Sequence, residues 1–101
     1  MVAVRPAPDS TDKYWVARID KILSWEEDPN KSSYRVKYYN NITNELPGEW
    51  RLVRRNAEGC FGEITGCSVL VCRFTLTKYS ALHKNTIDLI NSMIYLDEIH
   101  Q

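Results

Sequence analysis

The chain has 101 residues, and its 13 lysine and arginine residues are balanced by 13 aspartate and glutamate residues. A chain of this length folds as one domain around a single core, which excludes multidomain nucleotide-dependent enzymes. A formal net charge of zero argues against a domain whose main function is to bind a polyphosphate such as nucleic acid, because such domains usually carry a basic excess.

The chain lacks the signals of membrane insertion and secretion. No apolar run approaches the roughly 18 to 20 residues that cross a bilayer, and the N-terminal segment has no apolar stretch of the kind found in a signal peptide. We therefore expect no membrane partner and a cytosolic or nuclear location.

Period-two alternation of side chains predicts five strands. The clearest begins near Lys13, because Trp15, Ala17 and Ile19 fall on one face of an extended segment. A charged loop containing Pro29 separates it from the next alternating segment. The predicted strands cover about residues 2–5, 13–24, 33–40, 49–54 and 68–77.

The end of the chain has a different period. Ile87, Ile90, Met93 and Ile94 recur at a spacing of three and four, which predicts a helix over about residues 86–98. Short strands followed by one helix indicate a mainly β fold, a small barrel closed by a C-terminal helix, with one domain over residues 1–101.

The sequence indicates neither a metal site nor an enzyme. Cys60, Cys67 and Cys72 are too widely spaced to form the two close ligand pairs of a structural zinc site. There is no Gly-x-Ser-x-Gly elbow, phosphate-binding loop or His-Glu-x-x-His helix. We expect a non-enzymatic protein with no cofactor and no metal.

Aromatic residues collect at three strand ends. The start of the second strand, the end of the third and the start of the fourth meet at one rim of an antiparallel meander. Ring faces and a carboxylate at one rim can bind a methylated ammonium group. The candidate cage consists of Asp12, Tyr14, Trp15, Tyr38, Tyr39, Glu49 and Trp50. The alternative for rings such as Trp15 and Tyr38 is that they fill the core of the barrel.

Two segments carry a resemblance to a known group of folds. The segments Lys13–Ile22 and Tyr34–Asn40 resemble the Tudor and chromodomain barrels of the Royal superfamily. The segments Val2–Pro6 and Ile64–Leu70 are similar to parts of bromo-adjacent homology (BAH) domains. The resemblance implies an SH3-like five-stranded barrel with a C-terminal α-helix.

The same resemblance carries an expectation about function. It implies a nuclear, chromatin-associated module that reads methylated lysine or arginine on a histone tail or other peptide. By this resemblance, Tyr14 matches the aromatic residue at the mouth of the second strand, Tyr38 the cage ring of the third strand, and Trp50 the later tryptophan.

Two other functions fit parts of the sequence. The locally basic middle of the chain allows nucleic-acid binding, and the alternative for its cations is an ordinary solvated surface. The residues concerned are Arg51, Arg54, Arg55, Arg73, Lys78 and Lys84. The helical stripe of Ile87, Ile90, Met93 and Ile94 allows a homodimer, and its default role is to pack on the chain's own barrel.

Overall fold

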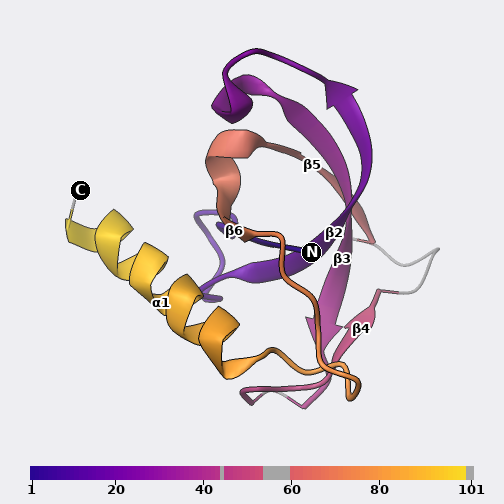
Figure 1. Ribbon diagram of the computed structural model, residues 1–101, viewed down its shortest axis with the longest axis vertical. Helices are drawn as coiled ribbons and strands as arrows, with labels where there is room; N and C mark the ends of the chain where they lie inside the picture. Colours follow the sequence, from indigo (N-terminus) through magenta and orange to yellow (C-terminus); the bar gives the residue numbers. More distant parts are fainter. Residues whose placement is uncertain (44, 54–59, 100–101) are drawn as a thin grey trace.

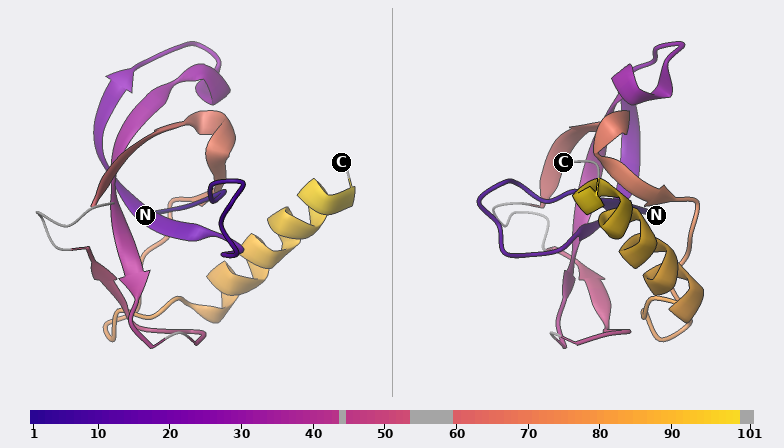
Figure 2. Two further views of the ribbon diagram at one scale, coloured as in Figure 1. Left: turned by 180° about the vertical axis from the view of Figure 1, so that it is seen from behind. Right: turned by 90° about the vertical axis from the view of Figure 1, so that its left-hand side faces the viewer.

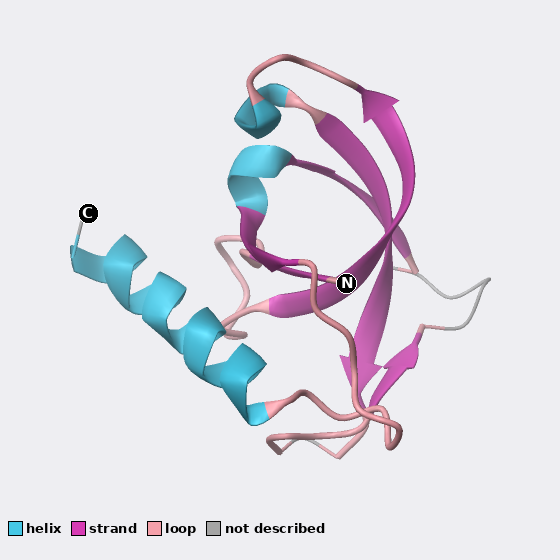
Figure 3. Ribbon diagram, in the orientation of Figure 1, coloured by secondary structure: helices cyan, strands magenta, loops and turns pink. Residues whose placement is uncertain are grey.

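The computed structural model describes residues 1–43, 45–53 and 60–99. These residues form one open antiparallel sheet of six strands and a C-terminal helix (Figures 1 and 3). The strands are β1 (Val2–Val4), β2 (Trp15–Ser24), β3 (Ser33–Asn41), β4 (Trp50–Leu52), β5 (Phe61–Thr65) and β6 (Val69–Cys72). The helices are the short 3-10 turns η1 (Pro29–Lys31) and η2 (Gly66–Ser68) and the α-helix α1 (Lys84–Ile99). The mainly β class and the C-terminal helix are confirmed.

The strand pattern differs from the prediction at two places. Strand β5 lies between the fourth and fifth predicted strands, over residues for which we predicted no strand. Gly62 is part of this strand because a Cβ there would lie 2.6 Å from the ring of Tyr38, so only glycine lets the two strands approach. The strand predicted over residues 68–77 ends at Cys72, since Arg73 has a φ of 61°, which an extended strand does not allow.

Strand β3 is the centre of the sheet. The strand order is β4-β3-β2-β1-β6, and β5 also pairs with β3. The N-terminal half of β3 pairs with β5 through Ser33 and Thr65, and its C-terminal end pairs with β4 through Asn41 and Trp50. The sheet therefore curls, with η2 bringing the chain from β5 back to β1 and β6 (Figure 1).

One part of the core lies on the inner face of the curled sheet. Its buried members are Val2, Val4, Ala17 and Val36, and the partly buried residues around them are Trp15, Tyr34, Tyr38, Ile64 and Val69. They share a face because alternate residues of paired antiparallel strands point the same way. The predicted inward face of the second strand is therefore correct at Trp15 and Ala17, while Ile19 remains 40% exposed.

The other face of the sheet packs against α1, as the two views of Figure 2 show. Ile90 is fully buried in a cluster with Ala3, Leu70 and Val71. All three residues of β1 are buried, because β1 has the inner core on one face and the helix on the other. Ala3 points toward the helix, where its small side chain lets the helix approach the sheet closely.

An ion pair fastens the end of the helix to the sheet. Two nitrogens of the Arg5 guanidinium, Nε and Nη2, donate to the two oxygens of Asp97 at 2.6 and 2.8 Å. Arg5 Nη1 also donates to the carbonyl of Cys67 in η2. The segment after β1, the turn η2 and the last turn of α1 are thus held by one side chain.

Candidate functional site

The structure contains an open cavity of about 790 Å³ at the start of β2 and the end of β3. Its wall includes five aromatic rings, one carboxylate and no cationic side chain among the described residues. The lining residues are Asp12, Tyr14, Trp15, Tyr38, Tyr39, Asn40, Asn41, Ile42, Trp50 and Val53. Six of the seven residues of the candidate cage therefore lie at one cavity.

The first aromatic pair in the wall is Trp15 with Tyr38. Their ring centroids lie 5.7 Å apart with an interplanar angle of 79°, an edge-to-face arrangement. Tyr38 is opposite Ala17 in the β2–β3 ladder, so Trp15 is its diagonal neighbour on the same face. The indole Nε1 of Trp15 donates to Asp12 Oδ2 at 2.8 Å, which fixes both the ring and the carboxylate.

The second pair, Tyr14 with Trp50, lies on the opposite face of the sheet. Their centroids are 6.2 Å apart, and the rings are stacked at 26°. Trp50 is only 8% exposed and packs with Val16 and Leu82, so it belongs largely to the core. Trp50 therefore fills the interior, while Trp15 and Tyr38 are half-buried, packing against the inner core and also lining the cavity.

The cavity lies where β2 and β3 separate. The last residue pair of their ladder is Val16 with Tyr39. Beyond it, β2 continues beside β1 and β3 continues beside β4. Rings from both faces of the sheet can reach this gap, which explains why Trp15 and Tyr14, neighbours in sequence, line the same space.

The separation also leaves a main-chain edge at the cavity. Ile42 donates its N–H to the Glu49 carbonyl at 2.9 Å, and Val53 donates to the Tyr38 carbonyl at 3.0 Å. Residues 38, 40 and 42 thus direct their main-chain groups toward β4. By alternation, the N–H and C=O of Asn41 face the side of β2, across the cavity. Sequence reasoning missed Asn40, Asn41, Ile42 and Val53, because none of them is aromatic or charged.

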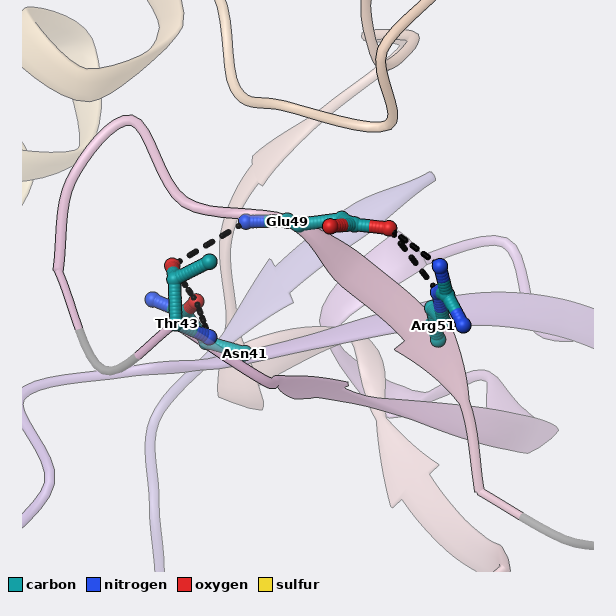
Figure 4. Close-up of polar contacts among 4 residues, drawn as sticks. All are labelled: Asn41, Thr43, Glu49 and Arg51. Atoms are coloured by element: carbon teal, nitrogen blue, oxygen red, sulfur yellow. Dashed lines mark hydrogen bonds and ion pairs between the residues drawn. The ribbon is translucent and has the colours of Figure 1, made fainter.

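The loop beside the cavity is organised by the side chain of Asn41 (Figure 4). Its Oδ1 accepts from the Oγ1 of Thr43 at 2.8 Å, and its Nδ2 donates to the Glu45 carbonyl at 2.7 Å. Gly48 closes the loop with a φ of 77°, and a Cβ there would lie within 2.8 Å of the Asn41 amide.

Glu49 does not take the place predicted for it. Its carboxylate forms an ion pair with Arg51 at 2.6 Å (Figure 4), and it is not among the residues that line the cavity. Residues two apart on an extended segment share a face, which brings Glu49 and Arg51 together. Asp12 is therefore the carboxylate of the site.

Burial also affects the tyrosines of the wall. It raises the pKa of both Tyr14 and Tyr38 above the ordinary value of 10, because a phenolate loses more hydration there than a phenol does. Both side chains are therefore uncharged over the physiological range, and the negative charge of the site comes from Asp12.

The replacement Tyr14→Phe is expected to raise the free energy of unfolding at pH 7 by about 1 kcal/mol. Among the described residues, the Tyr14 hydroxyl is buried without a hydrogen-bond partner, and such a group costs roughly 1 to 3 kcal/mol. Urea denaturation measures the change, with Tyr79→Phe, at a residue 74% exposed, as the control. A loss of stability in Tyr14→Phe alone would show that the hydroxyl has a partner.

The same pair of variants has a pH dependence. The pKa of Tyr14 is higher in the folded than in the unfolded chain, so the stability tied to its proton is complete below pH 10 and falls as the pH rises above that value. The unfolding free energy of Tyr14→Phe should therefore decline less between pH 9 and 11 than that of the unchanged protein.

The residues of the predicted nucleic-acid site belong to several elements of the described structure. Arg51 is paired with Glu49, and Lys78 lies 5.0 Å from the ring of Tyr79. Arg73 follows β6, and Lys84 begins α1. Arg54 and Arg55 lie outside the described residues.

The described residues also carry no metal cluster and no long apolar helix. No group of three or more His, Cys, Asp or Glu side chains there could hold a metal ion. Cys60 is buried, whereas Cys67 and Cys72 are exposed. Cys72 lies in the fifth predicted strand, and it is exposed at the end of β6. In this part of the chain, no helix has the length and hydropathy needed to cross a membrane.

Comparison with known proteins adds no family to this description. No protein-family model matches the chain, and no curated protein or solved structure is significantly similar to it.

Proposed function

We propose that the protein is a non-enzymatic, chromatin-associated binding module that recognises a methylated ammonium group on a histone tail or similar peptide. The observation that carries this proposal is the cavity wall, which combines five rings with one carboxylate and no cationic side chain among the described residues. Ring faces attract a cation and replace the water that it sheds on binding. The single charge of Asp12 selects against anions.

The dimensions of the cavity favour a peptide over an isolated cation. A volume of about 790 Å³ exceeds a trimethylammonium group severalfold, which leaves room for the side-chain stem and for neighbouring peptide groups. The N–H and C=O of Asn41 can pair with the main chain of an extended peptide. In this proposal the rings recognise the cation and β3 orients the peptide that carries it.

The proposal extends to the fold family and the location. The curled sheet with a helix against it supports an SH3-like barrel of the Tudor, chromodomain or BAH type, as the sequence segments imply. A histone-tail ligand places the protein in the nucleus. The rival function, binding to nucleic acid, has weaker support because Arg51 is already paired with Glu49.

A peptide titration tests the proposal. We expect a ten-residue peptide with a central trimethyllysine to bind in the micromolar range, while its unmethylated form binds at least threefold more weakly. Two-dimensional NMR should place the shifted resonances at Trp15, Tyr38 and Asn41. Equal affinity for the two peptides, or shifts elsewhere only, would remove the proposal.

The variant Asp12→Asn separates charge from structure. Its amide oxygen can still accept the indole N–H of Trp15, so the wall keeps its shape. We expect roughly 1.5- to 5-fold weaker binding of the methylated peptide, since an exposed charge pair contributes about 0.2 to 1 kcal/mol. Unchanged affinity in Asp12→Asn would show that the carboxylate plays no part.

A further inference from the structure

The far end of the β2–β3 hairpin exposes a group of large apolar side chains. This hairpin-tip patch consists of Ile19, Ile22, Leu23 and Trp25, which are 40%, 55%, 41% and 73% exposed. The hairpin rises beyond the rest of the molecule in both views of Figure 2. It is the opposite end of β2 from the cavity.

The register of the hairpin explains why Ile19 and Ile22 lie on one face. Ile19 pairs with the buried Val36, and Ile22 pairs with Tyr34, which packs against the inner core. A register shift just after Ile19 keeps both isoleucines on this one face, although they are three residues apart. The apolar surface of the core therefore continues to the hairpin tip without a cover.

The chain itself supplies little to cover this end of β2. Strand β1 pairs only with residues 15–17, and the strand residues from Arg18 to Ser24 are all exposed. Four large apolar side chains exposed within seven residues of one hairpin indicate an interaction site.

The charges beside the patch restrict what can bind it. Glu26, Glu27 and Asp28 follow Trp25 directly, and none of them forms an ion pair among the described residues. Over residues 21–31 these three carboxylates outnumber the two cations, Lys21 and Lys31, so the tip carries an acidic excess that disfavours an anionic membrane and nucleic acid. The carboxylates also oppose a second copy of the chain, because a symmetric contact at the tip would bring the two acidic segments together. A partner segment that is both apolar and basic complements the apolar patch and the carboxylates beside it.

The backbone indicates how such a partner binds. A second register shift, between Ile22 and Ser24, and the cation of Lys21 interrupt the regular edge that an added strand would need. Recognition must then rely on side chains, as when the apolar face of a helix lies on an apolar surface. We propose that the hairpin-tip patch docks a basic amphipathic helical segment of a partner protein. This inference does not depend on the function of the cavity.

A designed peptide provides the test. The probe is a fluorescently labelled 14-residue peptide of leucine and lysine with the leucines at helical spacing. Two matched peptides replace lysine by glutamate or rearrange the same residues into period-two alternation. Fluorescence anisotropy measures binding to the full chain, and we expect micromolar affinity for the helical basic peptide, which weakens as salt is raised.

Variants locate the contact. Trp25→Ala is expected to weaken binding at least tenfold, and the double change Glu26→Gln and Glu27→Gln at least threefold. Tyr79→Ala, at an equally exposed aromatic residue, should leave the affinity unchanged. A titration with the methylated peptide should be unaffected by Trp25→Ala, so failure of this inference and failure of the cavity proposal give different results.

Several outcomes would overturn the inference. Equal effects of Trp25→Ala and Tyr79→Ala would show that the tip is not the site. Equal binding of the acidic peptide would remove the role of the carboxylates, and stronger binding of the period-two peptide would indicate strand addition instead. Concentration-dependent dimerisation abolished by Trp25→Ala, or Trp25-dependent binding to phosphatidylcholine vesicles, would identify a second copy or a lipid surface as the occupant.

Discussion

The replacement Gly66→Ala is expected to cost about 3 kcal/mol or more of stability. A Cβ at this position would overlap the carbonyl oxygen of Pro29 and lie 2.8 Å from its carbonyl carbon. Both groups belong to main chain that cannot rotate away, and overpacking of this kind typically costs 1 to 3 kcal/mol or more. The Gly66 N–H also donates to the carbonyl of Ser32 at 2.9 Å, so a shift would break a hydrogen bond.

The contact matters because it joins two distant parts of the chain. It brings η2, which leads from β5 to β6, against the turn η1 of the β2–β3 hairpin (Figure 1). Urea denaturation measures the loss, with Cys67→Ala at the exposed next residue as the control that changes little. If Gly66→Ala is as stable as the control, η1 and η2 are not packed as described.

The replacement Ile90→Ala is expected to cost about 2 to 5 kcal/mol. Ile90 is fully buried between α1 and the sheet, in contact with the cluster of Ala3, Leu70 and Val71. Its truncation removes apolar burial and leaves a cavity that rigid strands cannot close. The effect should appear both as a lower midpoint in urea and as partial loss of helical circular dichroism.

The adjacent residue supplies the matched control. Leu89 is 52% exposed, so Leu89→Ala should change stability by less than about 1 kcal/mol. This pair of variants also decides between the two roles of the helical stripe. Packing on the chain's own sheet predicts a large loss for Ile90→Ala at every protein concentration, whereas a dimer held by this stripe predicts a loss that depends on concentration.

The sequence was informative where the period of the side chains was regular. Alternation from Trp15 to Ile19 indicated the inner face of β2, and antiparallel connection of three strand ends placed Tyr14, Tyr38 and Trp50 at one end of the sheet. These inferences depend only on local geometry and on short connections. The helix followed from its three-and-four spacing for the same reason.

Non-local contacts were not predictable in this way. Gly62 conceals β5 because its close approach to Tyr38 involves a residue 24 positions earlier in the chain. The pairing of Glu49 with Arg51 is local by contrast, since the residues lie two apart, and it withdrew a predicted carboxylate from the site. The main-chain edge at Asn41 cannot be recognised from any side chain. It arises where β2 pairs with β1 while β3 pairs with β4.

The three indole N–H resonances provide the most direct test of the central claim, that the cavity binds a methylated ammonium group. Trp15 donates its indole N–H to Asp12 inside the wall, Trp50 donates to the Pro47 carbonyl beneath it, and Trp25 is 73% exposed at the far hairpin tip. Titration with free trimethyllysine should shift the Trp15 resonance most, shift that of Trp50 less and leave that of Trp25 in place. A Trp15 resonance that does not move, or that moves equally with unmodified lysine, would contradict the account.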